Sequence, residues 1–233
     1  CLETYDRIIE LLEEKLEYVR LKKKWLVQNL LTEKRRLLGF HSAWKKVFIK
    51  DVVSEGSKER IADTNSYKKI TIKLNFKGIK FVNTIREMAD TRPFYIRRKG
   101  EIIVGKQNYF HGSIAIVDDK YDGTICSNAI MSFQVREEYC DKYFLLFYLS
   151  QTDYIKKKSF LANGTGQKEL SEKDFLNFDI RIPDIREQKA IAKVLTTAAK
   201  EIELLEKQLE QIKLEKKAMM QLLLTGIVRV DEK

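Results

Sequence analysis

Hydrophobic and polar positions alternate with a seven-residue period in two long segments, one near each end of the 233-residue chain. Apolar residues fall at the first and fourth positions of successive heptads, which is the pattern of a coiled-coil seam. The pattern therefore predicts two long α-helices that pair with each other. The residues expected at their interface are Ile9, Leu12, Leu16, Val19, Leu26, Leu30, Ile202, Leu205, Leu209, Ile212, Met219 and Leu223.

The two segments are also copies of one another. Residues 9–36, shifted by 193 positions, align without a gap with residues 202–229, and 15 of the 28 residues are identical. Chance identity between unrelated amphipathic helices is far lower, so we interpret the pair as an internal duplication. Lys23 and Lys216 occupy equivalent first positions of a heptad, where a polar residue costs stability but can fix the register.

Residues that flank the two segments indicate the direction of the helices. Gly39 predicts the end of the first helix, while Pro183 and Asp184, with Glu187 three residues after Asp184, predict the start of the second with a capping box. Both helices then meet the middle of the chain at the same end. They can pair only antiparallel, as a stalk about 50 Å long at roughly 1.5 Å per residue.

The middle of the chain predicts a mixed α/β domain. Strand-like runs begin at Lys68, Ile79, Glu101, Ser113 and Asn128, separated by turn signals. A helix from Asp141, with an aromatic and leucine face, is expected to pack in the core. The expected organisation is a first coiled-coil helix (1–38), a mixed α+β globular domain (39–182) and a second coiled-coil helix (183–233).

Charge points to the class of partner. With 44 Lys+Arg against 34 Asp+Glu, the net charge is +10, which favours a polyanion, nucleic acid first. Residues 66–110 hold 11 Lys+Arg against 3 Asp+Glu. Arg and Lys neutralise phosphates, and with Asn and Gln they hydrogen-bond base edges. The candidates for DNA contact are Arg92, Tyr95, Arg97, Arg98, Lys106, Asn108, Thr165, Gln167 and Lys168.

Several function classes are disfavoured by the remaining residues. Three widely spaced cysteines and two histidines predict neither a metal site nor a cofactor, and they fit a reducing cytoplasm. No apolar run approaches the roughly 20 residues of a membrane span. Pro183-Asp184 and Glu187-x-Lys189 contain the letters of the PD…ExK nuclease motif, but that motif needs its acidic groups on neighbouring strands. We therefore expect no catalytic site.

The second helix resembles the end of specificity subunits of type I restriction–modification enzymes. The start of this helix matches the family's Glu-Gln motif through Pro183, Glu187, Gln188, Ile191 and Ala192. Its end matches the family's closing motif through Lys216, Met220, Gln221, Leu223, Leu224, Thr225 and Gly226. The stretches "NGTGQKELS" (163–171) and "LLTEKRRLLGF" (30–40) are similar to the end and the beginning of that family's target-recognition domains. Glu33 stands where the family usually has Gly.

The resemblance implies a cytoplasmic subunit that has no catalytic site of its own. A membrane-surface role is not expected, because the helices lack a cationic face opposite a broad aromatic one. One target-recognition domain would read one half of a split double-stranded DNA site. The paired helices would act as the spacer and dock methyltransferase (modification) subunits, with the restriction subunit joining through the complex. The chain would be part of a two-domain subunit, or a half-sized subunit that forms a homodimer.

Two alternatives of other classes stay open. One is a coiled-coil assembly module whose basic domain binds RNA or protein without reading a DNA sequence. The other is an enzyme active on DNA without partners.

Overall fold

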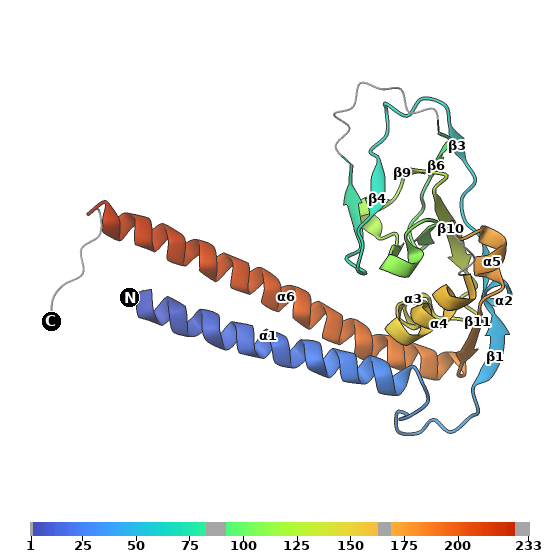
Figure 1. Ribbon diagram of the computed structural model, residues 1–233, viewed down its shortest axis with the longest axis horizontal. Coiled ribbons are helices and arrows are strands. Elements are labelled where there is room, and N and C mark those ends of the chain that lie inside the picture. Colours follow the sequence, from blue (N-terminus) through green and yellow to red (C-terminus); the bar gives the residue numbers. More distant parts are fainter. Residues whose placement is uncertain (1, 83–91, 163–168, 227–233) are drawn as a thin grey trace. The chain divides into compact units, whose positions relative to one another are not determined.

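The computed structural model of the chain describes residues 2–82, 92–162 and 169–226, and it divides into two units. Unit 1 comprises Cys1–Arg35 with Lys193–Lys233, and unit 2 comprises Arg36–Ala192 (Figure 1). The elements are α1 (Leu2–Leu30), β1 (Lys45–Phe48), α2 (Ile49–Val52), β2 (Val53–Glu55), β3 (Arg60–Ile61), β4 (Ile70–Ile72), β5 (Ile79–Phe81), β6 (Phe94–Ile96), β7 (Ile102–Gly105), η1 (Tyr109–His111), β8 (Ile114–Ile116), η2 (Asp119–Tyr121), β9 (Ile125–Ser127), β10 (Ile130–Val135), α3 (Lys142–Leu149), α4 (Thr152–Ala162), α5 (Glu172–Leu176), β11 (Asp179–Ile182) and α6 (Ile185–Leu224).

Unit 1 is an antiparallel pair of helices, α1 and the greater part of α6. Between Ile202 and Leu223, every position that is not exposed is the first or fourth of a heptad, and the same holds from Leu2 to Leu26. The centre of the seam is a cluster of Leu16, Val19 and Leu205, against which Leu12, Ile202 and Leu209 pack. The predicted fold class, a mixed α/β domain with an antiparallel pair of long helices, is confirmed.

The pairing of α1 with α6 has an approximate two-fold symmetry. Arg20 Nη2 lies 2.6 Å from Glu206 Oε1, and Lys213 Nζ lies 2.6 Å from Glu13 Oε1. The shift of 193 positions converts Glu13 into Glu206 and Arg20 into Lys213, so the two ion pairs are one interaction made twice. Exposed pairs of this kind contribute about 0.2–1 kcal/mol each, so they define the register more than they hold the helices together.

A third ion pair departs from this symmetry. Lys216, at a seam position, pairs with Asp6. The equivalent contact would join Lys23 to residue 199, which is Ala199. Burial lowers the pKa of Lys23, and the nearby Glu206 carboxylate opposes that shift. One seam lysine is therefore matched by a carboxylate at the equivalent position, whereas the other is not.

Helix α1 ends nine residues earlier than Gly39, where the sequence placed its end. The reason is local: Glu33 adopts a left-handed conformation with φ 59°, and Arg35 N donates to Asn29 O at 3.1 Å. Gly226, the residue equivalent to Glu33 in the second copy, has φ 72° just after α6. Both copies thus use a left-handed residue at the helix end, but only the second has the glycine that fits it without strain.

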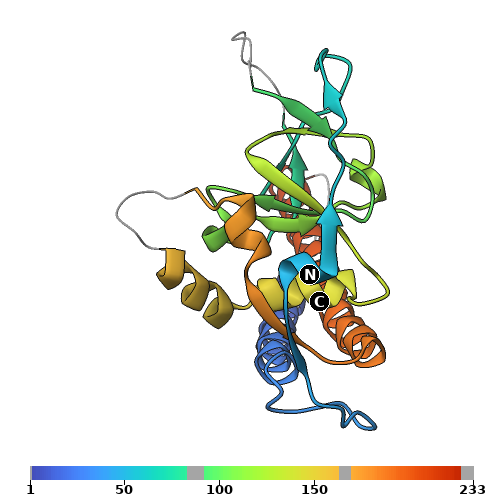
Figure 2. The same cartoon turned by 90° about the vertical axis from the view of Figure 1, so that its right-hand side faces the viewer.

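Unit 2 contains small antiparallel sheets. Their strand orders are β2-β10-β7-β8, β3-β6-β9, β4-β5 and β1-β11. A core cluster beneath β4 and β5 includes Ile70, Ile72, Ile103, Val117 and Tyr121. Figures 1 and 2 show α3 and α4 at one end of the unit and the strands of β3-β6-β9 and β4-β5 at the other.

The start of α6 is anchored within unit 2 by the EQ pair. Asp184 Oδ1 accepts hydrogen bonds from Arg186 N (2.9 Å) and Glu187 N (3.2 Å), which confirms the expected helix start. In a capping box, the Glu187 side chain would also bond to the backbone N–H of Asp184. Here the fully buried Glu187 carboxylate is instead bound by the Arg36 guanidinium, with Nε 3.0 Å from Oε1. Gln188 Nε2 donates to Pro183 O (2.9 Å), and the same side chain also forms hydrogen bonds with the segment before α3.

That segment carries the N-cap of α3. Gln188 Oε1 accepts from Asp141 N (3.0 Å), and Gln188 Nε2 donates to Tyr139 O (3.1 Å). Asp141 Oδ1 in turn accepts from Tyr143 N and Phe144 N. The single helix predicted from Asp141 is two helices, α3 and α4, because Ser150 ends the first and Gln151 N bonds to Tyr148 O. The aromatic and leucine face is buried as expected, with Phe144, Leu145 and Leu149 in the core.

The left-handed conformation of Glu33 leads to a stability prediction. We expect Glu33→Gly to raise the free energy of unfolding by about 0.5–1 kcal/mol, because glycine adopts φ near 59° without the clash of a Cβ atom. Glu17→Gly, the same change at an exposed position inside α1, should lower it by about 1 kcal/mol. Chemical denaturation of both variants measures this. Equal destabilisation by the two changes would contradict the account of the helix end.

Candidate nucleic-acid interface

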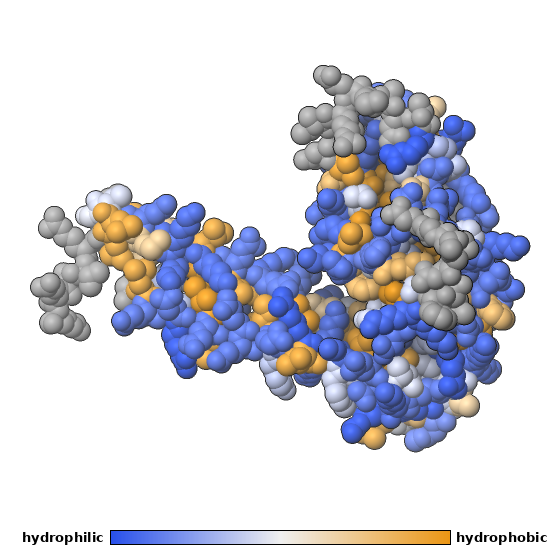
Figure 3. Space-filling model, in the orientation of Figure 1, coloured by the Kyte–Doolittle hydropathy of each residue, from blue (hydrophilic) through white to orange (hydrophobic). Residues whose placement is uncertain are grey.

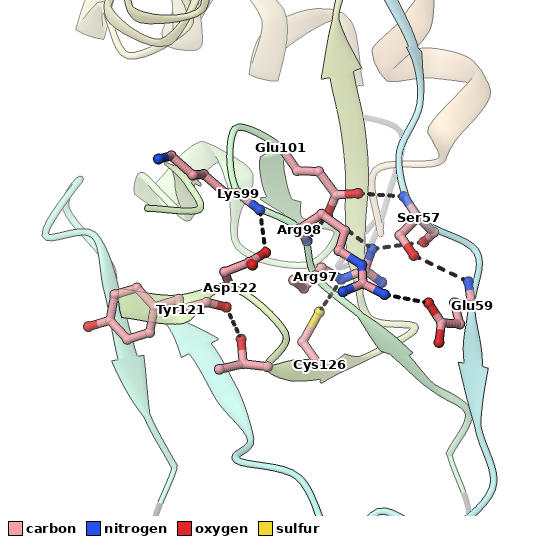
Figure 4. A network of polar contacts seen from close by, with 10 residues as sticks. Ser57, Glu59, Arg97, Arg98, Lys99, Glu101, Tyr121, Asp122 and Cys126 are labelled. Atoms are coloured by element: carbon pink, nitrogen blue, oxygen red, sulfur yellow. Dashed lines mark hydrogen bonds and ion pairs between the residues drawn. The ribbon is translucent and has the colours of Figure 1, made fainter. Parts of the chain in front are cut away.

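The turn between β6 and β7 contains three consecutive cations, and the first of them is buried. Arg97 is 3% exposed. Its Nε donates to Cys126 Sγ at 2.9 Å, its Nη1 donates to Ser57 O at 3.1 Å, and Nη1 lies 3.9 Å from Glu101 Oε2 (Figure 4). Glu101 is also buried, and it accepts a hydrogen bond from Arg98 N at 3.0 Å. Arg97 therefore organises the interior of unit 2, and at 3% exposure its side chain offers little surface to a nucleic acid.

The other two cations of this turn are exposed and paired. Arg98 Nη2 lies 2.7 Å from Glu59 Oε2, and Lys99 Nζ lies 2.5 Å from Asp119 Oδ1. The hydrogen bond to Asp119 raises the pKa of Lys99. These carboxylates reduce the positive potential that Arg98 and Lys99 present to an anion, although exposed pairs of this kind are weak. The run that looked most basic in the sequence is thus largely neutralised by its neighbours.

Tyr95 and Lys106, two predicted contact residues, come together in a surface pocket of about 180 Å³. The remaining lining residues are Gly56, Ser57, Lys58, Arg97, Asn128, Ile130, Met131, Ser132 and Glu172. Strand pairing places them: Tyr95 lies opposite Arg60 of β3 and Cys126 of β9, and Lys106 N donates to Ala129 O at 3.0 Å. The pocket therefore lies where the ends of β6, β7 and β10 meet.

Two residues that line this pocket, Gly56 and Ser132, approach each other closely. Gly56 N donates to Ser132 O at 2.9 Å, and a Cβ at position 56 would lie 2.2 Å from Ser132 Oγ. Within the described part of the chain, the buried Ser132 Oγ has no hydrogen-bond partner. The pocket thus contains a polar group that is able to accept or donate one more hydrogen bond.

Lys58, Lys106 and Asn128 supply the chemistry of the rim. Lys58 Nζ donates to Glu55 Oε1 at 2.8 Å, which raises the pKa of Lys58, and Lys106 Nζ lies 3.9 Å from a Glu169 carboxylate oxygen. Both lysines stay partly or fully exposed, as does Asn128. Lysines suit phosphate oxygens, and an asparagine amide can make paired hydrogen bonds to adenine. Sequence reasoning missed Lys58, which precedes the basic stretch, and took Asn128 only as a strand start.

The other predicted contact residues are not gathered at this pocket. Arg92 is exposed, and so is Asn108, which precedes η1 and whose carbonyl accepts from His111 N and Ser113 N at 3.0 Å. Thr165, Gln167 and Lys168 lie outside the described residues. Of the nine candidates, three line this pocket: Tyr95, Lys106 and the buried Arg97.

Metal and thiol chemistry gain no support in the described residues. Among residues 2–82, 92–162 and 169–226, no three His, Cys, Asp or Glu side chains are grouped so that they could hold a metal ion. Burial raises the pKa of the Cys126 thiol, and it raises the pKa of Cys140 to about 12, so both are protonated at neutral pH. No helix in the same ranges is long and apolar enough to cross a membrane.

Comparison with known proteins gives a consistent result. Residues 41–214 match the family model of the type I restriction modification DNA specificity domain. The type I restriction enzyme MjaVIII specificity subunit of Methanocaldococcus jannaschii is 29% identical over 250 residues, an alignment that covers 98% of this chain and 59% of that protein. The resemblance noted in the two helices is thereby confirmed.

Solved structures agree on the fold. The HsdS subunit from Thermoanaerobacter tengcongensis superposes with a TM-score of 0.59 at 15% identity, covering 95% of this chain and 54% of that one. The S subunit of a type I restriction-modification system from M. genitalium gives a TM-score of 0.63 at 13% identity, with coverages of 93% and 57%. The chain spans between half and three fifths of the length of these relatives.

The burial of Arg97 leads to a prediction that separates it from Arg98. We expect Arg97→Met to lower the free energy of unfolding by about 3 kcal/mol, because it leaves the buried Glu101 carboxylate without its cation. Arg98→Met should stay within about 0.5 kcal/mol of the wild type. Adding Glu101→Gln to Arg97→Met should recover part of the loss. Denaturant unfolding of the three variants measures this, and equal stability of the two single variants would contradict the assignment.

Proposed function

The chain belongs to the type I restriction–modification DNA specificity family, and we propose that its unit 2 recognises one half of a split double-stranded DNA site. The observation that carries this proposal is the pocket that joins Tyr95 and Lys106 to Lys58 and Asn128. Its lysines would contact phosphates and so position the duplex, whereas the Asn128 amide would contact a base edge and so select a sequence. Arg97 would hold β6, β7 and β9 in place beneath these groups.

Unit 1 would act as the spacer between two half-sites. Its α1 has 29 residues, which corresponds to a length of about 43 Å at roughly 1.5 Å per residue. The second half-site would be read by a further recognition domain, in a longer subunit or in a second copy of the chain.

The surface of unit 1 supports the proposal that it docks two methyltransferase subunits. Figure 3 shows hydrophobic patches along both helices among hydrophilic residues. Four of the exposed leucines away from the seam form two equivalent pairs under the shift of 193: Leu11 with Leu204, and Leu21 with Leu214. Equivalent apolar positions on the two copies suit two copies of one partner. The restriction subunit would join through the complex, and the chain would contribute no catalytic group of its own.

Selection from a randomised duplex library, with and without the methyltransferase subunits and at two salt concentrations, tests the function. We expect one short half-site to be enriched by the chain alone, and two half-sites at a fixed spacing when the recognition domains are paired. Retention of DNA without any enriched sequence, lost steeply as salt rises, would indicate phosphate attraction only. The coiled-coil assembly module would then be the better account.

Variants of the pocket test its role on the enriched duplex. Lys106→Ala should weaken binding to all sequences and reduce the slope of log affinity against log salt by about one. Asn128→Ala should instead reduce the discrimination between bases at one position by about 1–3 kcal/mol. Lys207→Ala removes the same charge from an exposed i,i+4 pair of α6 and serves as the control. Unchanged affinity and selectivity in both pocket variants would place the DNA contact elsewhere on unit 2.

A further inference from the structure

The hairpin formed by β4 and β5 is the most basic part of unit 2 that carries no acidic residue. Residues 67–82 contain Lys68, Lys69, Lys73, Lys77 and Lys80, and neither Asp nor Glu. Lys73, Lys77 and Lys80 are exposed, and within the described residues none of the three pairs with a carboxylate. This distinguishes the hairpin from the turn at Arg98 and Lys99, where each cation has an acidic neighbour.

The hairpin is a ribbon with one buried and one polar face. Strand β4 pairs antiparallel with β5, with Ile72 opposite Ile79 and Thr71 opposite Lys80. Ile70, Ile72 and Ile79 enter the core of unit 2. Because side chains alternate along a strand, Thr71, Lys73 and Lys80 belong to the opposite face. That face is therefore basic and directed away from the core.

The ribbon is braced from beneath. Tyr121 Oη donates to Ile79 O at 2.9 Å, and the Tyr121 ring packs on Phe81 with centroids 5.0 Å apart. Figure 4 shows Tyr121 beside the two pale strands of the hairpin, close to the network around Arg97. Lys68 and Lys120 lie over the face of Phe81, at 5.6 and 5.7 Å from its centroid. These contacts attach the hairpin to the core of unit 2 through Tyr121 and Phe81.

The tip of the hairpin combines backbone strain with exposed apolar side chains. Asn75 and Phe76 have φ of 57° and 58°, the left-handed region that favours glycine. Their N–H groups donate to His111 O (2.8 Å) and Gly112 O (3.0 Å), which holds the turn in place. A Cβ on Gly112 would lie 2.9 Å from Phe76 N, so this contact requires glycine. Despite this, Phe76 is 42% and Leu74 is 45% exposed.

A large side chain at this position needs a reason other than packing. Glycine would relieve the strain at residue 76, and the exposed ring adds little to the core. A two-stranded ribbon fits the major groove of duplex DNA, lysines neutralise the phosphates on its walls, and apolar side chains contact base edges such as the thymine methyl group. The ligand that matches all three features is a DNA duplex.

We propose that the β4–β5 hairpin is a second DNA-reading element of unit 2, which lies in a groove with Lys73, Lys77 and Lys80 on phosphates and with Phe76 against the bases. This inference rests on the proposed function and extends it to residues that neither the sequence analysis nor the pocket identified. Strained backbone at an exposed position is a known feature of binding sites, and here it places an aromatic ring at the tip of a cationic ribbon.

Phe76→Gly separates a binding role from a structural one. The variant removes the ring and relieves the left-handed strain, so its thermal unfolding midpoint should rise by about 2 °C or stay unchanged. Its affinity for the duplex enriched by the wild-type chain should fall about tenfold, the effect of losing one base-pair contact. The preference at one or two positions of the selected sequence should also be lost. Phe48→Ala, with a similar exposure of 40% in β1, is the control and should bind as the wild type does.

Lysine variants test the other half of the proposal. Lys73→Ala, Lys77→Ala and Lys80→Ala should each lower the slope of log affinity against log salt by about 0.9 without changing the selected sequence. Lys207→Ala in unit 1 should leave this slope unchanged.

The outcomes separate the two proposals. If the wild-type chain enriches a sequence but Phe76→Gly selects the same sequence with the same affinity, the hairpin inference is overturned while the proposed function stands. A lower unfolding midpoint with unaltered binding would also overturn it, because Phe76 would then be a packing residue. If the wild-type chain retains no duplex at all, the proposed function and the hairpin inference both fail.

Discussion

The antiparallel pairing of α1 with α6 depends on how the chain enters and leaves unit 2. Strands β1 and β11 pair antiparallel from Lys45 opposite Ile182 to Phe48 opposite Asp179, so the two ends of the unit lie side by side. The Arg36 guanidinium then holds the buried Glu187 carboxylate at the start of α6. A buried carboxylate is costly unless a cation is placed on it, which makes this pair a strong constraint on the path of the chain. Two helices joined to neighbouring points can pair along their length only by running antiparallel.

That constraint explains why a duplicated helix is useful. Two copies of one amphipathic helix, paired antiparallel, are related by a two-fold axis and present the same contacts twice. The Arg20–Glu206 and Glu13–Lys213 pairs are such a repeat, and the exposed leucines at 11 and 204 and at 21 and 214 are another. The symmetry is incomplete at the seam lysines, because Lys216 pairs with Asp6 whereas Ala199 stands at the position equivalent to Asp6 in the second copy. The helix pair can therefore offer two equivalent surfaces while it keeps a defined register.

In unit 2, tertiary neighbours determine how much positive charge a basic run presents at the surface. The run Arg97-Arg98-Lys99 is surrounded by Glu101, Glu59 and Asp119, and its first member is in the interior. The hairpin lysines are scattered among apolar residues in the sequence, yet folding places several of them on one face of a ribbon with an aromatic ring at its tip. The potential that a polyanion encounters is set by which charges remain without a counter-charge on the surface, and less by how densely they occur along the chain.

Features that rest on local periodicity could be predicted from the amino-acid sequence. The heptads located both helices and their seam, Asp184 marked the start of α6, and the repeat fixed which residues are equivalent, because these depend on neighbours within a turn or two of helix. Local backbone conformation at Glu33 and Ser150 moved two helix ends away from their predicted positions, and the tertiary structure decided which cations are available. Arg98 and Glu59 are far apart in the chain, and they form an ion pair because β3 pairs with β6. Burial and charge pairing are set by such non-local contacts, which no local pattern records.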